Sequence, residues 1–430
     1  MTYSEATEYL YNSTPVFEHV GASAYKEGLE TTITLDNYFG NPHRKYKTIH
    51  VAGTNGKGSC SHTIASILQE EGHKVGLYTS PHLVDFRERI KVNGVPVEKE
   101  YVIGFIKDYR NFFEPLHPSF FELTTAMAFK YFAEQNVDFA VIEVGLGGRL
   151  DCTNIISPIL SIITNISFDH VQFLGNTLAK IAREKAGIIK ESVPVVIGST
   201  TPETKEVFSE YASKRNAPIV FAEDNPYVLS RAEIGDNVEY NTRIGNIISP
   251  LGGEYQEENL NTILHATEVL KESVIFKNYA DSIKAGVKNV IANTGLSGRW
   301  QIIKEKPKVV CDTGHNVGGW KYLSRQIKKQ KCKTLRIVFG MVDDKDINSV
   351  MELLPKNAIY YFTKAKTHRA INESEVMSAG ERHGLCGRKY RNVPLAYMAA
   401  LDDAESDDFI FIGGSSYVVA DFMEWFMGQQ

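Results

Sequence analysis

The sequence has few cysteines, no long hydrophobic run and no excess of positive charge. Its five cysteines are an odd number and form no Cys-x-x-Cys pair, which favours free thiols in a reducing compartment over disulfides or a zinc site. The longest uncharged stretch, Cys152–Phe168, contains Pro158 and several polar residues, and it falls short of the ~20 apolar residues that a membrane helix needs. The formal net charge of −5 argues against a nucleic-acid-binding surface.

The N-terminal segment also lacks the features of a secretion signal. Met1–Ser13 has neither a basic region nor a continuous apolar run. With 43% hydrophobic and 23% charged residues, the composition is that of an ordinary soluble globular protein. We therefore expect a soluble, cytoplasmic chain without a membrane or nucleic-acid partner, and its 430 residues predict about two or three domains.

The strongest positive signal is a glycine-rich loop between a strand and a helix. Lys47–Ala52 has the Ile and Val content of a short buried strand, which Gly53 and Gly56 interrupt. Apolar residues then recur at helical spacing from Ser59 onward. Such a loop cradles phosphate, because backbone N–H groups and the helix N-terminus face an anion to which Lys57 adds a full positive charge. We predict a nucleoside-triphosphate site; the alternative is a glycine turn with a surface lysine.

Strands alternate with helices along most of the chain. Near-continuous apolar runs such as Phe139–Val144 and Ile159–Ile163 are typical of parallel strands covered on both faces. This alternation predicts right-handed crossovers and a doubly wound, mostly parallel sheet of the α/β class. Ligands bind such sheets beyond the carboxyl ends of the strands. The residues at or just beyond such ends are Lys57, Ser80, Glu143 and His170.

The pattern changes in the second half of the chain. Residues 219–255 alternate and contain several glycines, which indicates strands and hairpins. Asn293–Gly298 is rich in turn residues, and the strand–helix alternation begins again at Lys308–Asp312. We therefore predict a nucleotide-binding domain of the phosphate-loop type over residues 1–295 and a smaller Rossmann-like α/β domain over residues 296–430.

A series of different short motifs is spread over nearly the whole chain. They are His50-Val-Ala-Gly-Thr-Asn-Gly-Lys-Gly-Ser59, Ser80-Pro-His-Leu83, Glu88-Arg-Ile90, Glu143-Val-Gly-Leu-Gly-Gly-Arg149, Asp169-His170, Glu184-Lys-Ala-Gly-Ile188, Gly298-Arg299, Asp312 with His315-Asn316, and Gly414-Ser415 with Tyr417. Together they resemble the motifs of Mur-ligase-type, ATP-dependent amide-forming enzymes. The Ser-Pro-His-Leu motif followed by Glu-Arg-Ile is similar to the folylpolyglutamate synthase/dihydrofolate synthase branch of that family.

The resemblance implies an ATP-dependent ligase that adds L-glutamate to the γ-carboxylate of a reduced folate, or joins glutamate to dihydropteroate. ATP would phosphorylate the carboxylate, and the amine of glutamate would attack the acyl phosphate. Both steps build negative charge, which cations and N–H donors stabilise. The implied cofactors are ATP and Mg²⁺ at two sites, and the implied partners are small-molecule substrates of a monomeric chain.

The resemblance divides the nucleotide site between the two domains. The expected nucleotide ligands are Thr54, Asn55, Gly56, Lys57, Gly58, Ser59, Asn259, Arg299 and Asp312. The Arg299 guanidinium suits phosphate and the Asp312 carboxylate suits ribose hydroxyls, whereas Asn259 has the alternative of a solvent-facing helix residue. We expect the domains to close about residues 293–298, which excludes water from the acyl phosphate.

Magnesium prefers oxygen ligands and keeps several of its waters, so one carboxylate and one hydroxyl suffice beside the phosphates. Glu143 and Ser80 are the candidates, with Ser59 as a further one. His170 resembles the family's ligand to a second magnesium ion, although the residue types alone favour Asp169, since imidazole is an unusual magnesium ligand. The alternative for His170 is a hydrogen-bonded core histidine.

Lys185 resembles the family's carbamylated lysine, whose carbamate offers oxygen donors to a cation; the alternative is a surface lysine paired with a carboxylate. The implied catalytic residues are Lys57, Glu143, His170 and Lys185. The residues expected to bind the incoming glutamate are His315, Ser415 and Tyr417. The folate is expected near Ser80–Phe86, including His82, and near Tyr25–Leu29, where an aromatic pterin could stack.

Three other functions fit part of the pattern. A peptidoglycan amino-acid ligase would depend on a nucleotide sugar and normally has a further N-terminal domain, for which residues 1–46 leave no room. A nucleotide switch would hydrolyse ATP without needing an amino acid. A kinase would leave the Asp312–Asn316 cluster unexplained.

Overall fold

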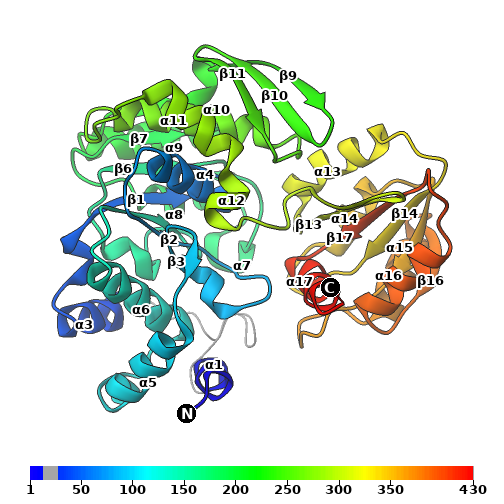
Figure 1. The fold of residues 1–430 in the computed structure, drawn as a ribbon, viewed down its shortest axis with the longest axis horizontal. Helices are drawn as coiled ribbons and strands as arrows, with labels where there is room; N and C mark the ends of the chain where they lie inside the picture. The colour runs from blue at the N-terminus through cyan, green and yellow to red at the C-terminus, as the bar shows by residue number, and fades with distance from the viewer. Residues whose placement is uncertain (13–27, 430) are drawn as a thin grey trace.

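An eight-stranded sheet forms the centre of the N-terminal half of the chain in the computed structural model, which describes residues 1–12 and 28–429 (Figure 1). Its strand order is β4-β3-β2-β5-β1-β6-β7-β8. The strands are β1 (Lys47–Ala52), β2 (Val75–Tyr78), β3 (Ile90–Val92), β4 (Val95–Pro96), β5 (Phe139–Glu143), β6 (Leu160–Ile163), β7 (Val195–Ile197) and β8 (Ile219–Phe221). Strand β3 pairs antiparallel with both β2 and β4, and all other neighbouring strands of this sheet are parallel. The predicted doubly wound, mostly parallel sheet is confirmed.

Helices cover both faces of this sheet. They are α1 (Tyr3–Asn12), α3 (Glu30–Tyr38), α4 (Lys57–Glu70), α5 (Lys99–Phe113), α6 (Phe120–Glu134), α7 (Val171–Leu174), α8 (Leu178–Ala186), α9 (Pro202–Lys214), α10 (Gln256–Leu270), α11 (Tyr279–Lys288) and α12 (Val290–Thr294). On β5, Val141 packs in the core that contains α4 and α10, whereas Ala140 and Ile142 pack in the core beneath α5 and α6. Successive side chains of a strand point to opposite faces, so a strand buried on both sides is apolar throughout.

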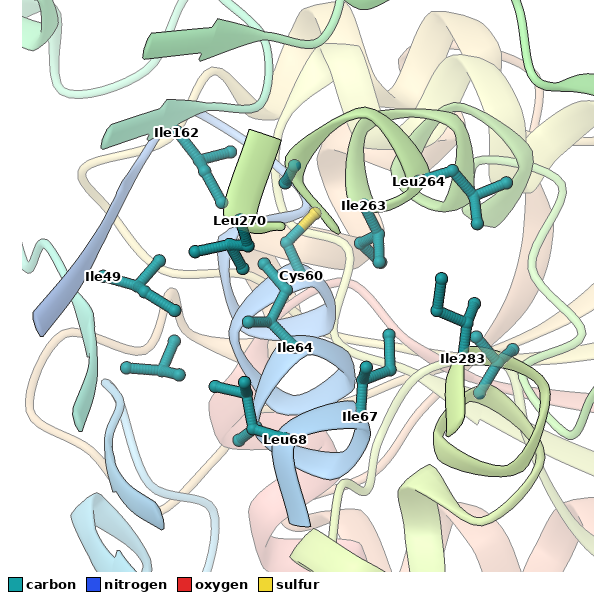
Figure 2. Close-up of a cluster of buried hydrophobic side chains, with 14 of the residues drawn as sticks. Ile49, Cys60, Ile64, Ile67, Leu68, Ile162, Ile263, Leu264, Leu270 and Ile283 are labelled. Carbon is teal, nitrogen blue, oxygen red and sulfur yellow. The ribbon is translucent and has the colours of Figure 1, made fainter. Parts of the chain in front are cut away.

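Helix α4, which follows the glycine loop, is buried between the sheet and two other helices. Ile64 and Leu68 belong to the same buried cluster as Ile49 of β1, while Ile67 points toward Ile283 of α11 (Figure 2). A side chain at Gly286 of α11 would collide with the backbone of Ile67, so the two helices approach closely. A helix that is buried on nearly all sides is held firmly, and here it fixes the position of the loop that precedes it.

A small antiparallel sheet follows the first large sheet. Its strands are β9 (Val228–Ile234), β10 (Asn237–Thr242) and β11 (Gly245–Ser249), in the order β11-β10-β9. The strands and hairpins predicted within residues 219–255 are confirmed. This sheet packs against the core that contains α4, through Val238, Tyr240 and Ile247.

The C-terminal half contains a second large sheet with helices around it (Figure 1). Its strands are β12 (Gln301–Glu305), β13 (Lys308–Asp312), β14 (Leu335–Phe339), β15 (Ala358–Phe362), β16 (Cys386–Lys389) and β17 (Phe409–Gly413), in the order β12-β13-β17-β14-β15-β16. All neighbours except β12 and β13 are parallel. The helices are α13 (Val317–Lys329), α14 (Ile347–Leu353), α15 (Glu373–Arg382), α16 (Val393–Asp402) and α17 (Ser416–Met427). The Rossmann-like arrangement is confirmed.

The link between the two halves starts from a fixed point. Lys91 Nζ donates to the Thr294 carbonyl at 2.8 Å, and His62 Nδ1 lies 2.8 Å from Thr294 Oγ1. Gly295 then ends α12 in a left-handed conformation with φ of 64°. The first half therefore holds the chain up to Thr294. Across residues 1–12 and 28–429, none of the helices combines the length and the apolar character needed to span a bilayer.

The buried position of α4 leads to a prediction for stability. Ile64→Ala removes most of a side chain that is 1% exposed, and we expect it to lower the free energy of unfolding by about 2–5 kcal/mol, because a cavity remains. Urea unfolding would measure the change. Ile275→Ala is the control, since Ile275 is 86% exposed, and its effect should stay within about 0.5 kcal/mol. Equal effects of the two changes would contradict the prediction.

Candidate active site

The loop after β1 is shaped by side chains that close in on its glycines. Gly53 and Gly56 have φ of 144° and 86°. A Cβ atom at Gly53 would lie 1.9 Å from Thr164 Oγ1, and one at Gly56 would lie 2.2 Å from Asn259 Oδ1. Only glycine combines these backbone angles with such close neighbours.

Two N–H groups of the loop are already used within the protein. Thr54 N–H donates to the Asn165 carbonyl at 2.9 Å, and Asn55 N–H donates to Asn165 Oδ1 at 3.0 Å. The N–H groups of Lys57, Gly58 and Ser59 belong to the first turn of α4, where helix geometry supplies no partner. These N–H groups can therefore bind an anion.

Two lysines meet at one carbonyl of this loop. Lys57 Nζ donates to the carbonyls of Gly53 and Thr54 at 3.1 and 3.2 Å, and Lys185 Nζ donates to the Gly53 carbonyl at 2.8 Å. Lys185 is 4% exposed, and burial together with the nearby charge of Lys57 lowers its pKa to about 7. Both lysines line one cavity. Because Lys185 is buried, its alternative as a surface lysine paired with a carboxylate is wrong.

A buried carboxylate faces the same helix turn. Glu143, the last residue of β5, is 4% exposed and accepts a hydrogen bond from Ser80 N–H at 3.2 Å. Burial raises the pKa of Glu143, and the charge of Lys57 offsets part of that effect. A Cβ atom on Gly58 would lie 3.8 Å from Glu143 Oε2 and 3.5 Å from Arg299 Nη2. Sequence-distant groups thus gather around the start of α4.

The other predicted ligands near α4 lie on its α10 side. Ser59 Oγ accepts a hydrogen bond from Gln256 Nε2 at 3.1 Å, and Asn259 Nδ2 donates to Gln256 Oε1 at 2.8 Å. Both Ser59 and Asn259 are buried. The alternative of a solvent-facing Asn259 is therefore wrong.

Asp169 connects the two halves of the chain. It accepts hydrogen bonds from Asn316 Nδ2 at 3.1 Å and from Lys345 Nζ, and it lies 3.3 Å from His315 Nε2. Although burial acts to raise it, the hydrogen bond from His315 and the neighbouring positive charges hold the pKa of Asp169 well below its usual range. The Asp169 side chain therefore pairs mainly with the second half of the chain.

His170 begins α7 in a left-handed conformation, and its Nε2 lies 3.8 Å from Asp169 Oδ1. Burial lowers the pKa of His170 to about 3. The imidazole is therefore neutral at physiological pH, which is the form that can donate an electron pair to a metal ion.

The carboxylate of Asp312 holds together the start of the second half. It accepts hydrogen bonds from Tyr255 Oη, Trp300 N–H and Gly314 N–H, at 2.6 to 2.8 Å. Burial raises its pKa. The neighbouring Arg299 donates to Thr313 Oγ1 and to the carbonyl of Gly298.

A cavity of about 270 Å³ joins these groups. From the first half it is lined by Lys57, Ser80, His170 and Lys185, and from the second half by His315, Lys345, Arg369, Ser415 and Tyr417. The apolar part of its wall includes Pro81, Phe120, Phe121, Leu146, Leu150 and Leu174, and Arg89, Glu122 and Asp151 also line it. Asp169, His170, Asp344, Lys345 and Arg369 also line an adjoining cavity of about 750 Å³.

The predicted substrate residues differ in how they reach the cavity. Ser415 caps α17 by accepting a hydrogen bond from Val418 N–H at 3.2 Å. Tyr417 Oη lies 3.5 Å from Arg369 Nη1. His82 lies between Arg89 and Tyr11, with Nδ1 accepting from Arg89 Nε at 2.8 Å and Nε2 lying 3.0 Å from Tyr11 Oη.

Of the predicted folate segment Tyr25–Leu29, the residues up to 27 lie outside the described part of the chain, and Gly28 lines the cavity. The sequence analysis did not single out Lys345 and Arg369. They follow β14 and β15, so the rule that ligands bind beyond the carboxyl ends of parallel strands could have found them. Phe120 and Phe121 lie inside a helix and carry no such signal.

The residues present suit magnesium better than a metal that needs several protein ligands. Within residues 1–12 and 28–429, no group of three or more His, Cys, Asp or Glu side chains could hold a metal ion. Glu143 and Ser80 instead offer one carboxylate and one hydroxyl beside the anion-binding turn of α4. Phosphate oxygens and water can complete such a magnesium shell.

Comparisons with known proteins agree with this geometry. The family model for the Mur ligase middle domain matches residues 51–266, and the model for the Mur ligase, glutamate ligase domain matches residues 298–416. The dihydrofolate synthase/folylpolyglutamate synthase of Bacillus subtilis (strain 168) is 33% identical over 411 residues, which cover 92% of this chain and 94% of that protein.

Solved structures are similar over the full length. Escherichia coli FolC in complex with DHPP and ADP has a TM-score of 0.85 at 28% identity, covering 100% of this chain and 98% of that one. Mycobacterium tuberculosis folylpolyglutamate synthase complexed with ADP and AMPPCP has a TM-score of 0.86 at 28% identity, covering 99% of each chain.

The lowered pKa of Lys185 predicts a pH-dependent stability. Below pH 7 the amine is protonated in both states, whereas between about 7 and 10.5 only the unfolded chain holds the proton. Rising pH therefore favours the folded state in this window. Relative to Lys185→Met, we expect the wild type to gain up to about 1.4 kcal/mol of unfolding free energy per pH unit.

Urea unfolding across this pH range would measure the difference. Lys214→Met, which changes an exposed lysine, is the control and should run parallel to the wild type. Parallel curves for the wild type and Lys185→Met would contradict the prediction.

Proposed function

Because the chain belongs to the Mur ligase family, in its folylpolyglutamate synthase/dihydrofolate synthase group, we propose that it is an ATP-dependent ligase that adds L-glutamate to the γ-carboxylate of a reduced folate. The observation that supports this most directly is one cavity lined by the anion-binding loop, by Lys57 and Lys185, and by cationic groups from the second half of the chain. The buried Glu143 carboxylate lies beside it, bonded to Ser80 N–H. The name of the Bacillus subtilis relative supports a second reaction, the joining of glutamate to dihydropteroate.

The reaction proceeds in two steps. The substrate carboxylate attacks the γ-phosphorus of ATP, which gives an acyl phosphate and ADP, and the amine of glutamate then displaces phosphate from the acyl carbon. The N–H groups of Gly56–Ser59 and the Lys57 ammonium stabilise the phosphoryl oxygens in the first step. Lys57 must leave the carbonyls of Gly53 and Thr54 to reach a phosphate. The positions of Asn259 next to Gly56 and of Arg299 next to Gly58 support their proposed contacts with the remainder of the nucleotide. Asp312 is the proposed ligand of the ribose hydroxyls.

Glu143 and Ser80 are the proposed ligands of one magnesium ion, with Ser59 nearby, and His170 is the proposed ligand of a second. Bound Mg²⁺ would neutralise charge on the phosphates and polarise the transferred group. The raised pKa of Glu143 supports this role, because a cation beside the buried carboxylate would restore its charged form. The neutral imidazole of His170 supports the second assignment.

Lys185 is the proposed site of carbamylation. Its nitrogen attacks the carbon of CO₂ and loses a proton, which requires the unprotonated amine. A pKa of about 7 provides that form at neutral pH. The product carries negative charge in place of the ammonium and would pair with Lys57 or with a nearby metal ion.

Both organic substrates have suitable surroundings. The glutamate carboxylates fit the cations Lys345 and Arg369. His315, Ser415 and Tyr417 line the same cavity, and Ser415 also caps α17. The folate ring system fits the wall that contains Phe120 and Phe121. His82 does not itself line the cavity. It would act indirectly, by accepting a hydrogen bond from Arg89, which does line it.

The proposed domains are residues 1–295, which carry ATP and the folate, and residues 296–430, which carry the glutamate site. The attachment of Thr294 to Lys91 and His62 supports a hinge at residues 293–298. Closure about this hinge would exclude water from the acyl phosphate. We further propose a monomer in the cytoplasm, in keeping with five free cysteines.

The function is tested by ATP-dependent incorporation of labelled glutamate, with tetrahydrofolate and dihydropteroate in parallel reactions. We expect incorporation with tetrahydrofolate, and phosphate release that requires both the pteridine acid and glutamate. Incorporation with dihydropteroate would show the second activity. Phosphate release that does not need an amino acid would instead support a nucleotide switch.

Lys185→Ala tests the carbamate. We expect kcat to fall by about 10²–10³-fold, because a charge that stabilises the transition state is lost. A short carboxylic acid such as acetate should restore part of the activity, since it replaces the missing carboxylate-like group. Lys190→Ala is the matched control, because Lys190 also has a lowered pKa but bonds to the Asn154 carbonyl away from the cavity. Unchanged activity of Lys185→Ala would refute the role.

A further inference from the structure

A pair of asparagine side chains joins the phosphate loop to the second half of the chain. Asn55 Nδ2 donates to Asn316 Oδ1 at 3.2 Å, and Asn316 Nδ2 donates to Asn55 Oδ1 at 3.0 Å. The two residues are 261 positions apart, and Asn316 is 5% exposed. Each side chain both donates and accepts, so the contact fixes distance and orientation together.

The chemistry of its neighbours fixes the Asn316 amide in one orientation. Its Oδ1 accepts from Gly319 N–H at 2.9 Å, which caps α13, and its Nδ2 donates to Asp169 Oδ2 at 3.1 Å. An N–H group can only donate and an ionised carboxylate can only accept, so a flipped amide would lose both bonds. With Asn55 as the remaining partner, both donors and both acceptor positions of Asn316 are filled.

Asn55 is equally constrained on its own side. Its Nδ2 also donates to Ser167 Oγ at 3.2 Å. The first turn of α13 comes so close that a Cβ atom on Gly318 would lie 2.8 Å from Ser167 Oγ and 3.1 Å from Asn55 Nδ2. The pair therefore connects two ordered segments, and α13 lies on the side of the second half that faces the first (Figure 1).

Resting on the proposed ligase function, we infer that Asn55 and Asn316 are positioning residues that align the amino-acid site with the phosphate loop. Asn55 stands between Thr54 and Gly56, so the loop shape that presents N–H groups to phosphate also directs the Asn55 side chain. Asn316 directly follows His315 and begins α13, so its position sets that of the glutamate site. Neither side chain touches the reacting atoms.

This role separates the chemistry from nucleotide binding. The amine must reach the acyl carbon along a narrow range of approach, and a misplacement of about 1 Å can cost roughly 10²-fold in rate. The N–H donors of Gly56–Ser59 and the Lys57 ammonium lie in the first half and do not depend on the pair. Loss of the Asn316 side of the pair should therefore lower kcat much more than it weakens nucleotide binding, because these phosphate donors stay in place.

The test uses variants that keep the local structure of each segment. Asn316→Ser retains an acceptor for the α13 cap but is too short to reach Asn55, and Asn55→Ser removes the amide while the backbone bond to Asn165 remains. Asn392→Ser is the matched control, because Asn392 caps α16 through Leu395 N–H in the same manner. The two single variants, their double variant and the control are compared in the full-length protein.

We expect each single variant to lower kcat for glutamate addition by about 10- to 100-fold. For Asn316→Ser, whose side chain is not among the expected nucleotide ligands, the dissociation constant for ADP should change by less than about 3-fold. Both single changes remove the shared Asn55–Asn316 contact, so the loss of kcat in the double variant should be clearly smaller than the product of the two single losses. Asn392→Ser should behave as the wild type. Fully multiplying effects in the double variant would overturn the inference. So would a dissociation constant for ADP that weakens in parallel with kcat in Asn316→Ser.

Small-angle X-ray scattering with a non-hydrolysable ATP analogue gives a readout that does not depend on turnover. Both single variants should show a larger radius of gyration than the wild type and Asn392→Ser. Equal radii in all four proteins would overturn the inference. A wild type that binds the analogue but incorporates no glutamate would overturn the proposed function instead, and the scattering comparison would still decide the role of the pair.

Discussion

The structure depends on how the turn after β1 is held. Its two left-handed glycines are enclosed by Thr164 and Asn259, and its N–H groups at positions 54 and 55 are bonded to Asn165. Helix α4 begins directly after the turn and is buried on all sides, so its first turn cannot shift without disturbing a packed core. Every proposed role of the site follows from this one rigid anion-binding corner.

The buried charges near this corner fall into two kinds. Asp169 has cationic and hydrogen-bonding partners within the protein, and its pKa is held low. Compensation is incomplete for Glu143 and Lys185, so burial moves the pKa of each toward the neutral form. Charges that the fold satisfies internally serve to hold the two halves together. Charges that the fold leaves under-compensated are suited to phosphate, metal or carbon dioxide.

The glycine motif, the strand ends and the motif order were sufficient to predict both sheets and most of the candidate site. Four of the predicted residues lie at the end of a strand or in the turn after it. Three of them, Lys57, Ser80 and His170, line one cavity. The fourth, Glu143, lies next to Ser80 and Gly58. Lys345 and Arg369 obey the same rule on the second sheet but stand in loops without a glycine signature. The aromatic residues of α6 obey no such rule, because a helix face toward a cavity has the same pattern as one toward a core.

The sequence alone determined the elements and the chemical groups, because strand burial, glycine turns and helix starts are encoded within a few neighbouring residues. The tertiary structure alone decided which groups interact: that Lys57 and Lys185 share the Gly53 carbonyl, that Asp169 pairs with Lys345, and that Asn55 meets Asn316. The contacts of Lys185, Asp169 and Asn55 join residues more than a hundred positions apart. The last two connect the two sheets, whose relative placement no local pattern records. Burial and long-range pairing set the pKa values as well, and neither is a property of a residue in isolation.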